Sequence, residues 1–210
     1  MDQYKETFET WNKVAQLYQE KFMYLTLYDE SYDAFYDLIK NENAKILDAG
    51  CGPGNISHFL LSKYAGLEIE GIDIAPNMIE LARKNVSTLQ FKILDLRNVN
   101  QLEKKYDGII CGFGLPYLSE IDCRKFIIDC FNLLSEKGVF YLSFVEGNPD
   151  QSGFKTASSG DRTYFHFYTL DFLLKLLFEV GFESPAVMKI KYNKSVDETE
   201  EHTILIAKKK

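Results

Sequence analysis

Apolar side chains recur every three or four positions over the first 40 residues of the chain, which is the spacing of amphipathic α-helices. A second stretch with the same spacing begins at about Asp29. The pattern therefore predicts consecutive helices at the start of the chain, each with one apolar face. The apolar positions are Trp11, Val14, Ala15, Tyr18, Phe22 and Leu25 in the first stretch, and Tyr32, Phe35, Tyr36 and Ile39 in the second.

From Lys45 onward, short apolar runs typical of buried strands alternate with stretches of helical spacing. Strands that alternate with helices predict an α/β fold, a doubly wound parallel sheet covered by helices on both faces. The strand-like runs are Ile46–Ala49, Ile69–Ile74, Phe91–Leu94, Gly108–Phe113 and Val139–Val145. The helical stretches between them are about Ile56–Tyr64, Pro76–Val86 and Asp122–Leu134.

The end of the chain departs from this alternation. Thr169 is a candidate N-cap for an amphipathic helix that ends at Gly181. The strand-like runs Ala186–Tyr192 and Thr203–Ala207 have no helix between them, so we expect them to pair antiparallel. The stretch Gly147–Thr163 is rich in Gly, Ser and Asp, and it predicts either a linker or a lid over a site.

Composition narrows the class of protein. The 210 residues are 46% hydrophobic and 26% charged, which suits a single globular domain and excludes wholesale disorder. No apolar run reaches the roughly 18 residues of a transmembrane helix, and the polar N-terminus resembles no secretory signal. Four cysteines without a Cys-x-x-Cys pair indicate a reducing, cytoplasmic location, and with three scattered histidines they predict no metal site. A net charge of −7 disfavours nucleic acid as a partner.

A glycine-rich turn, ILDAGCGPGN at residues 46–55, follows the first predicted strand. Glycines there let the backbone bend tightly and approach a ligand closely. Their spacing is G-x-G-x-G, whereas a dinucleotide fingerprint needs a third glycine where Asn55 stands, and no Gly-Lys-Ser/Thr closes a P-loop. The alternative is a tight strand–helix turn that binds nothing.

Three further strand ends carry Asp or Gly: Asp73, Asp95 and the run Cys111–Gly114. In open parallel sheets, ligands bind outside the carboxyl ends of the strands, near the point where the strand order reverses. Asp73 stands 25 positions after Asp48, where an acidic side chain can accept hydrogen bonds from both hydroxyls of a ribose. A single aspartate is more often a turn residue, but four consecutive strand ends of this kind indicate a binding cleft.

These motifs together resemble the class I S-adenosylmethionine-dependent methyltransferases, in particular the small-molecule, ubiquinone/menaquinone methyltransferase-like branch. The matching stretches are ILDAGCGPGN, GIDIAPNMIELARKN, FKILDLRN, YDGIICGFGLPYLS and LLSEKGVFYLSFVE, within about residues 44–146. The resemblance implies a single domain with a Rossmann-like sheet of seven strands in order 3-2-1-4-5-7-6, the last strand antiparallel. Residues 1–43 then form a helical cover, 44–146 the cofactor-binding core, 147–168 a substrate lid, and 169–210 the last helix and the strand pair.

The resemblance also assigns cofactor contacts to twelve residues. The glycine loop would cradle the methionine part of S-adenosylmethionine, an acidic residue would hold the ribose, and apolar and acidic residues would enclose the adenine. The end of the fourth strand would lie under the sulfonium, and an aromatic residue on the first helix would cover the cofactor. In that order the residues are Asp48, Gly50 and Gly52; Asp73; Ile74, Met78, Asp95 and Leu96; Cys111, Gly112 and Phe113; and Tyr18.

Three side chains are candidates for proton transfer to or from the acceptor. His166 follows the expected lid and has a side chain that titrates near neutral pH, although it also suits an aromatic packing cluster. Glu146 ends the fifth strand, where it can face the acceptor or lie in solvent. Tyr117 can line the pocket or pack the next helix. His58 and His202 are expected to be structural or solvent-facing.

The resemblance implies an enzyme that transfers the methyl group of S-adenosylmethionine to a small molecule, with S-adenosylhomocysteine as product. The Asn/Asp-Pro-Pro-Tyr/Phe motif of nucleobase methyltransferases is absent, and residues 112–117 read GFGLPY there instead. We expect no nucleic-acid or membrane partner and a monomer or homodimer. The alternatives are an inactive or regulatory cofactor-binding protein and a nicotinamide-dependent oxidoreductase, which the glycine spacing disfavours.

Overall fold

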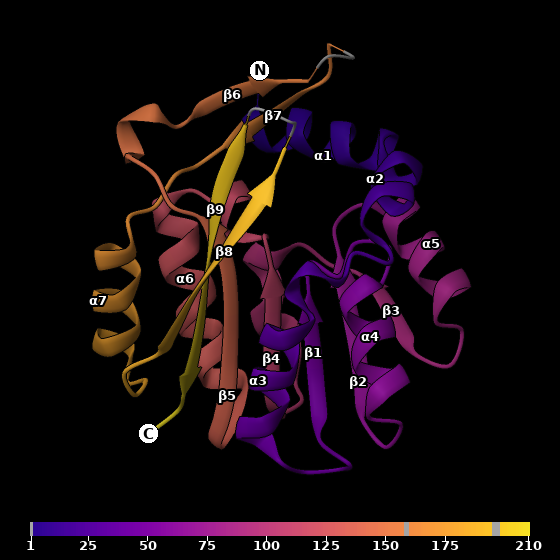
Figure 1. Ribbon diagram of the computed structural model, residues 1–210, viewed down its shortest axis with the longest axis vertical. Helices are drawn as coiled ribbons and strands as arrows, with labels where there is room; N and C mark the ends of the chain where they lie inside the picture. Colours follow the sequence, from indigo (N-terminus) through magenta and orange to yellow (C-terminus); the bar gives the residue numbers. More distant parts are fainter. Residues whose placement is uncertain (1, 158–159, 195–197) are drawn as a thin grey trace.

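The computed structural model describes residues 2–157, 160–194 and 198–210, which form a layered α/β structure (Figure 1). The strands of the main sheet are β1 (Lys45–Ala49), β2 (Glu68–Asp73), β3 (Gln90–Ile93), β4 (Tyr106–Gly112), β5 (Leu134–Val145), β8 (Ala186–Asn193) and β9 (Thr199–Lys208). Their order is β3-β2-β1-β4-β5-β9-β8, in which β1 to β5 are parallel and β9 is antiparallel to β5 and β8. The predicted fold class, strand order and antiparallel last strand are confirmed.

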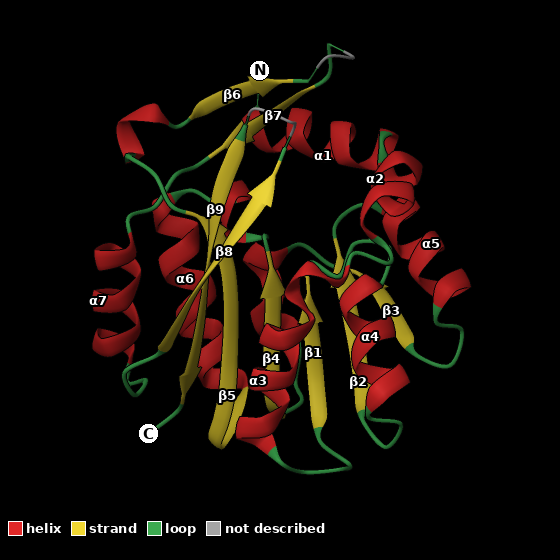
Figure 2. Cartoon of the chain, in the orientation of Figure 1, coloured by secondary structure: helices red, strands yellow, loops and turns green. Residues whose placement is uncertain are grey.

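Helices cover both faces of this sheet (Figure 2). Leu60 and Phe35 pack α4 (Asn55–Lys63) and α3 (Asp29–Ile39) on one face, and Phe126 and Leu177 pack α6 (Glu120–Leu133) and α7 (Leu170–Val180) on the other. On α5 (Pro76–Asn85), Ile79 shares a core cluster with Phe91 of β3. None of the helices formed by the described residues combines the length and apolar character needed to cross a membrane.

The predicted boundaries of α7 are confirmed in detail. The Thr169 side chain accepts a hydrogen bond from the Phe172 amide, 3.2 Å away, and so caps the first turn. Gly181 ends the helix with φ of 115°, a left-handed conformation that glycine adopts without a steric penalty.

The first predicted helix is divided into two. Val14, with φ −91° and ψ 10°, separates α1 (Gln3–Lys13) from α2 (Ala15–Phe22), and the short 3-10 helix η1 (Thr26–Tyr28) follows before α3. Both α1 and α2 lie beyond the carboxyl ends of the parallel strands, at the top of the molecule in Figure 1. The helical segment expected to cover the binding cleft is therefore two helices with an angle between them.

The stretch after β5, expected to be irregular, contains a β-hairpin. Its strands β6 (Gly153–Thr156) and β7 (Arg162–Phe165) pair antiparallel in a sheet of their own; residues 158 and 159 of the expected lid lie outside the described part of the chain. Thr7 accepts from the Tyr164 amide (2.9 Å), and Thr10 donates to the Arg162 carbonyl (2.7 Å). The hairpin thus holds α1 in place from outside.

Candidate functional site

A cavity lies at the carboxyl ends of β1, β2 and β4, underneath α1; its empty space, including the part open to solvent, is about 890 Å3. We call it the first cavity. Ten of the twelve residues that the family resemblance assigned to a cofactor line it. They are Tyr18, Gly50, Gly52, Asp73, Ile74, Met78, Asp95, Leu96, Gly112 and Phe113. Residues from four strand ends and from the N-terminal helices therefore meet around one space.

The glycine loop is tied to the end of the neighbouring strand β2. Gly50 (φ 77°) and Gly52 (φ 52°) are both in the left-handed region, so side chains at these positions would strain the turn. A Cβ atom at Gly52 would also stand 3.6 Å from the Tyr18 ring, against the wall of the cavity. The Gly52 amide donates to the Asp73 carboxylate over 3.0 Å, and the Ala75 amide donates to it over 2.8 Å. The Asp73 carboxylate is thus held in one orientation at the cavity wall.

Burial makes two carboxyl groups of this region weakly acidic. Loss of solvent raises the pKa of Asp73 to about 6, although the amide hydrogen bonds oppose the shift. Loss of solvent also raises the pKa of Asp48 to about 7, against the stabilising hydrogen bonds from Ser57. Asp48 is fully buried and accepts from the Ser57 hydroxyl (2.6 Å) at the start of α4, so it braces the glycine loop from beneath. Cys111 is likewise fully buried, underneath the lining.

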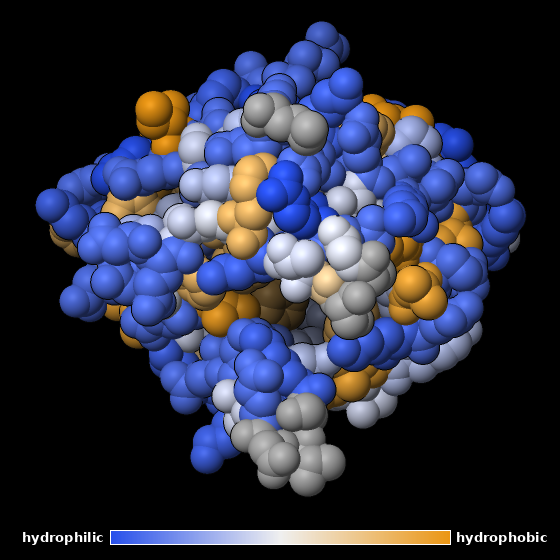
Figure 3. All heavy atoms as spheres, turned by 90° about the horizontal axis from the view of Figure 1, so that it is seen from above, coloured by the Kyte–Doolittle hydropathy of each residue, from blue (hydrophilic) through white to orange (hydrophobic). Residues whose placement is uncertain are grey.

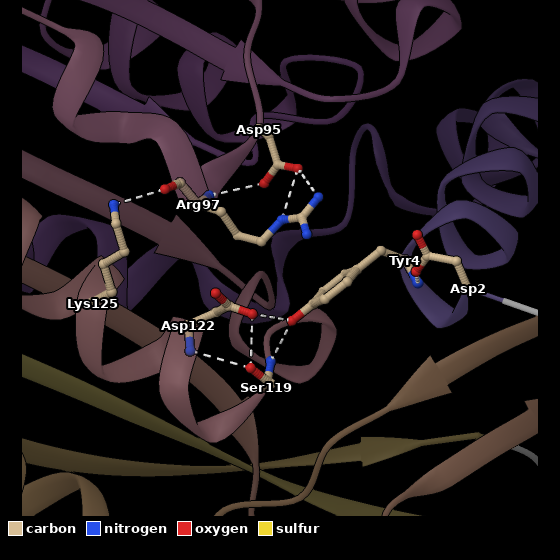
Figure 4. A network of polar contacts seen from close by, with 7 residues as sticks. All are labelled: Asp2, Tyr4, Asp95, Arg97, Ser119, Asp122 and Lys125. Atoms are coloured by element: carbon tan, nitrogen blue, oxygen red, sulfur yellow. Dashed lines mark hydrogen bonds and ion pairs between the residues drawn. The ribbon is translucent and has the colours of Figure 1, made fainter.

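The far end of the first cavity carries a polar network that joins α1 to the rest of the molecule (Figure 4). Asp95 accepts from the backbone and side chain of Arg97, over 2.8 and 2.9 Å. The Arg97 guanidinium lies 3.9 Å from the centre of the Tyr4 ring. The Tyr4 hydroxyl donates to Asp122 and accepts from the Ser119 amide (2.9 Å). The start of α1 is therefore fastened to the rim of the cavity.

A second cavity, whose empty space including the part open to solvent is about 930 Å3, adjoins the first and is lined largely by aromatic side chains. Figure 3, which views this end of the molecule, shows a hollow with apolar residues at its edge on a mostly hydrophilic face. Phe113 has φ of 56°, unusual for a residue with a side chain, and is held there by its amide bonds to Ser143. The residues that line both cavities are Trp11, Tyr18, Gly50, Gly112, Phe113 and Tyr117. The two spaces therefore meet at the end of β4.

The sequence interpretation missed His202, which we expected to be structural or solvent-facing. It lines the second cavity, is buried, and contacts Tyr28 and Glu200 through its two ring nitrogens. The period of two along β9 places Glu200 and His202 on the same face as Ile204, a core residue. This alternation could have indicated that His202 faces the interior. Its contact with Tyr28 could not be predicted in the same way, because Tyr28 lies 174 positions away along the chain.

Of the three candidates for proton transfer, Tyr117 alone lines the cavities. We expected the Glu146 carboxylate to face the acceptor or to lie in solvent. In the structure it accepts a hydrogen bond from the Leu170 amide (3.1 Å) and pairs with Lys189 (2.6 Å). It thereby anchors the start of α7 rather than facing an acceptor.

His166 lies outside the lining of both cavities. Its amide donates to the Pro116 carbonyl (2.7 Å), and its ring packs 4.6 Å from Tyr164. Burial lowers the pKa of its imidazole. These contacts favour the alternative of an aromatic packing cluster. Among the described residues, no group of three or more His, Cys, Asp or Glu is placed to hold a metal ion.

Residues 46–138 match a family model described as a methyltransferase domain. The chain is 32% identical over 94 residues to a demethylmenaquinone methyltransferase of Thermotoga maritima, covering 45% of this chain and 40% of the relative. It is 37% identical over 87 residues to a malonyl-[acyl-carrier protein] O-methyltransferase of Acetivibrio thermocellus, covering 40% and 30%. The matched stretch thus spans two fifths or less of either relative's length.

Solved structures show the same fold. Magnesium protoporphyrin IX methyltransferase from Synechocystis, in a structure with bound S-adenosylhomocysteine, superimposes with a TM-score of 0.73 over 100% of both chains at 20% identity. The strand order and the glycine loop are thus those of a methyltransferase-type fold, and residues 46–138, somewhat less than half of the chain, resemble a methyltransferase domain. The structures of magnesium protoporphyrin IX methyltransferase hold S-adenosylmethionine or S-adenosylhomocysteine.

Proposed function

We propose that this protein binds S-adenosylmethionine in the first cavity and transfers its methyl group to a small molecule held in the second. The observation that carries the proposal is the meeting of the two cavities at Gly112, Phe113 and Tyr117. A donor and an acceptor bound on either side of this junction would approach each other within the protein. Holding two reactants in line in this way can contribute roughly 7–11 kcal/mol to catalysis.

The residues around the first cavity fit the parts of this cofactor. The bare backbone of Gly50 and Gly52 leaves room for its amino-acid end, and the half-buried Asp73 carboxylate suits the two ribose hydroxyls. Ile74 and Met78 supply apolar surface for a flat base. Trp11 on α1 and Tyr18 on α2 close the space from above. We thus propose a cofactor contact for each of these residues, and we propose that residues 1–43 cover the bound cofactor.

The cofactor, when bound, supplies an activated methyl group on a sulfonium. The chain's own contribution is to orient both partners and to exclude water from the junction. The aromatic walls of the second cavity suit a partly apolar small molecule. The similarity to a protein named demethylmenaquinone methyltransferase supports such an acceptor, as in the branch that the sequence resembles. The hairpin touches this cavity through Phe165, which is the contribution we propose for residues 147–168.

A thermal-shift comparison tests the cofactor. Stabilisation by a ligand that binds only the folded state follows RT ln(1 + [L]/Kd), about 2.7 kcal/mol at a hundredfold excess. S-adenosylhomocysteine should raise the melting temperature, whereas NADH should leave it unchanged. A shift with NADH and none with S-adenosylhomocysteine would favour the oxidoreductase alternative. Incubation with radiolabelled S-adenosylmethionine and a panel of small molecules then tests transfer itself, and so separates an active enzyme from an inactive binder.

A further inference from the structure

Three polar side chains form a hydrogen-bonded chain in the wall of the second cavity. The Tyr28 hydroxyl lies 2.7 Å from Nδ1 of His202, and Nε2 of the same ring lies 2.9 Å from the Glu200 carboxylate. A carboxylate can only accept, so Nε2 of the neutral ring carries the proton and Nδ1 accepts from the Tyr28 hydroxyl. The Tyr28 oxygen then keeps lone pairs that can accept a hydrogen bond from a molecule in the cavity.

Packing holds the three hydrogen-bonded side chains next to the junction of the cavities. The His202 ring stacks on Tyr192, with ring centres 5.0 Å apart, and meets the Phe113 ring edge-on at 4.7 Å. Tyr28 also packs against Phe113, at 5.4 Å. On β9, His202 is paired with Val145 of β5 and with a residue of β8, so its backbone is fixed from both sides. Phe113 lines both cavities, which places the Tyr28 hydroxyl on the acceptor side of the junction.

The electrostatic surroundings keep the His202 ring neutral and the Tyr28 hydroxyl protonated at neutral pH, which are the forms that the hydrogen bonds require. Burial lowers the pKa of His202, and the adjacent Glu200 carboxylate opposes that shift. Burial raises the pKa of Tyr28 above its usual range. Glu200 has a lowered pKa because Lys194 and His202 hydrogen-bond to it, so it is ionised at neutral pH. The other titratable groups that act on these residues are Tyr18, Tyr141 and Tyr192.

We propose that Tyr28, His202 and Glu200 form a proton relay for an uncharged, ring-containing acceptor whose hydroxyl is methylated. This inference rests on the proposed function and names its acceptor class and its base. As the acceptor oxygen bonds to the methyl carbon, the carbon–sulfur bond breaks and its electron pair stays on sulfur. The hydroxyl proton passes to the Tyr28 oxygen, while the Tyr28 proton passes to Nδ1 of His202. Glu200 stabilises the resulting imidazolium.

The lining of the second cavity favours this acceptor over a charged one. Among the described residues that line it, none is Lys or Arg, so a carboxylate acceptor would find no counter-charge. A carboxylate is also already ionised at neutral pH and gains nothing from a base, whereas a ring hydroxyl loses its proton only with help. Lys194 pairs with the Glu200 carboxylate of the lining, so a cationic amine would find no free negative charge there. Aromatic neighbours such as Phe22 and Phe165 suit a flat ring.

4-Nitrophenol tests the relay without requiring turnover. Its hydroxyl has an acidity close to that of imidazole, and its ionised form has a distinct absorbance band. Calorimetry first measures S-adenosylhomocysteine binding to the wild type and to Tyr28→Phe, His202→Gln and Glu200→Gln. The nitrophenol is then titrated into each complex between pH 5 and 8. We expect the wild type to bind it and to raise its ionisation constant about tenfold relative to water. The variants should keep cofactor affinity within about twofold and lose most of that increase.

Matched controls are available at Tyr24 and at His58 of α4. Tyr24→Phe and His58→Gln make the same changes at two residues that contact each other at 5.8 Å but line neither cavity. Both controls should behave as the wild type. Failure of the wild type to bind S-adenosylhomocysteine would contradict the proposed function. If the wild type binds S-adenosylhomocysteine but not nitrophenol, the acceptor class is contradicted. If it binds nitrophenol without changing its ionisation constant, or if the three variants raise that constant as much as the wild type does, the relay is contradicted.

Discussion

The Asp73 carboxylate accepts a hydrogen bond from the Gly52 amide over 3.0 Å, so the end of β2 holds the glycine loop that follows β1. The same carboxylate lines the first cavity, where its proposed ligand is the ribose. One side chain therefore links the shape of the loop to the recognition of the ligand. Its pKa of about 6 also makes that link sensitive to pH.

Asp73→Asn should weaken the binding of S-adenosylhomocysteine by about 10- to 100-fold. The substitution keeps the shape but removes charge-assisted hydrogen bonds, which contribute about 1.5–3 kcal/mol each. Wild-type affinity should fall as the pH drops below about 6, because protonation removes the charge that the ribose hydroxyls meet. The variant should lack this pH step. Calorimetry at pH 5 and pH 8 measures both effects, and equal affinities for the two proteins at pH 8 would show that Asp73 does not hold the ribose.

Asp48→Asn should make the stability of the ligand-free protein less dependent on pH. The folded protein holds the Asp48 proton up to about pH 7, whereas the unfolded chain releases it near 4. The native state therefore binds more protons between these values, so the free energy of unfolding falls as the pH rises through them, by on the order of a few kcal/mol. The amide in the variant can still accept from Ser57 and carries no charge. Melting temperatures from pH 4 to 8 should decline less in Asp48→Asn than in the wild type or in the exposed control Asp37→Asn; parallel curves would contradict the raised pKa.

Tyr4→Phe should loosen α1 without unfolding the domain. The hydroxyl bridges Asp122 and the Ser119 amide, and its loss should lower the local opening free energy by about 1–2 kcal/mol. Hydrogen exchange across residues 3–13 should become faster, and S-adenosylhomocysteine should dissociate faster because α1 covers its proposed site. Exchange at α7 serves as the internal reference. Unchanged exchange in α1 would mean that the hairpin contacts alone fix the helix.

Tyr168→Phe should destabilise the fold and leave cofactor affinity unchanged. Tyr168 is 4% exposed, its ring stacks on Phe172, and its hydroxyl donates to the Leu118 carbonyl. Removing the donor leaves a buried carbonyl without its partner, at a cost of about 1–3 kcal/mol. Urea denaturation measures this cost, with Tyr24→Phe, at a residue 79% exposed, as the control. A variant as stable as the wild type but with weakened cofactor binding would contradict this structural role and place Tyr168 in the site.

Most of the sheet was predictable because its signals are local. The alternation of apolar runs and helical spacing located every strand of the main sheet, and the cap residues Thr169 and Gly181 fixed the bounds of α7. Glycines and aspartates at the strand ends identified the first cavity for the same reason. The position of each of these residues in the fold can be inferred from the residues next to it in the sequence.

The remaining features depend on contacts between distant parts of the chain. The hairpin strand Gly153–Thr156 is short and mostly exposed, so it has no apolar alternation to reveal it. Its position depends on hydrogen bonds between β7 and α1, from residues such as Thr7. The environment of His202 likewise depends on Tyr28, from the other end of the chain. Glu146 differs from expectation because Lys189, on a strand more than 40 residues later, neutralises it.

Trp11 offers the most direct test of the central claim, that the first cavity binds the cofactor beside an acceptor cavity. It is the single tryptophan of the chain and lines both cavities. Titration with S-adenosylhomocysteine, followed by tryptophan emission, should give a saturable change that Asp73→Asn shifts to at least tenfold higher ligand concentration. No saturable change, or the same midpoint in the wild type and the variant, would contradict the account.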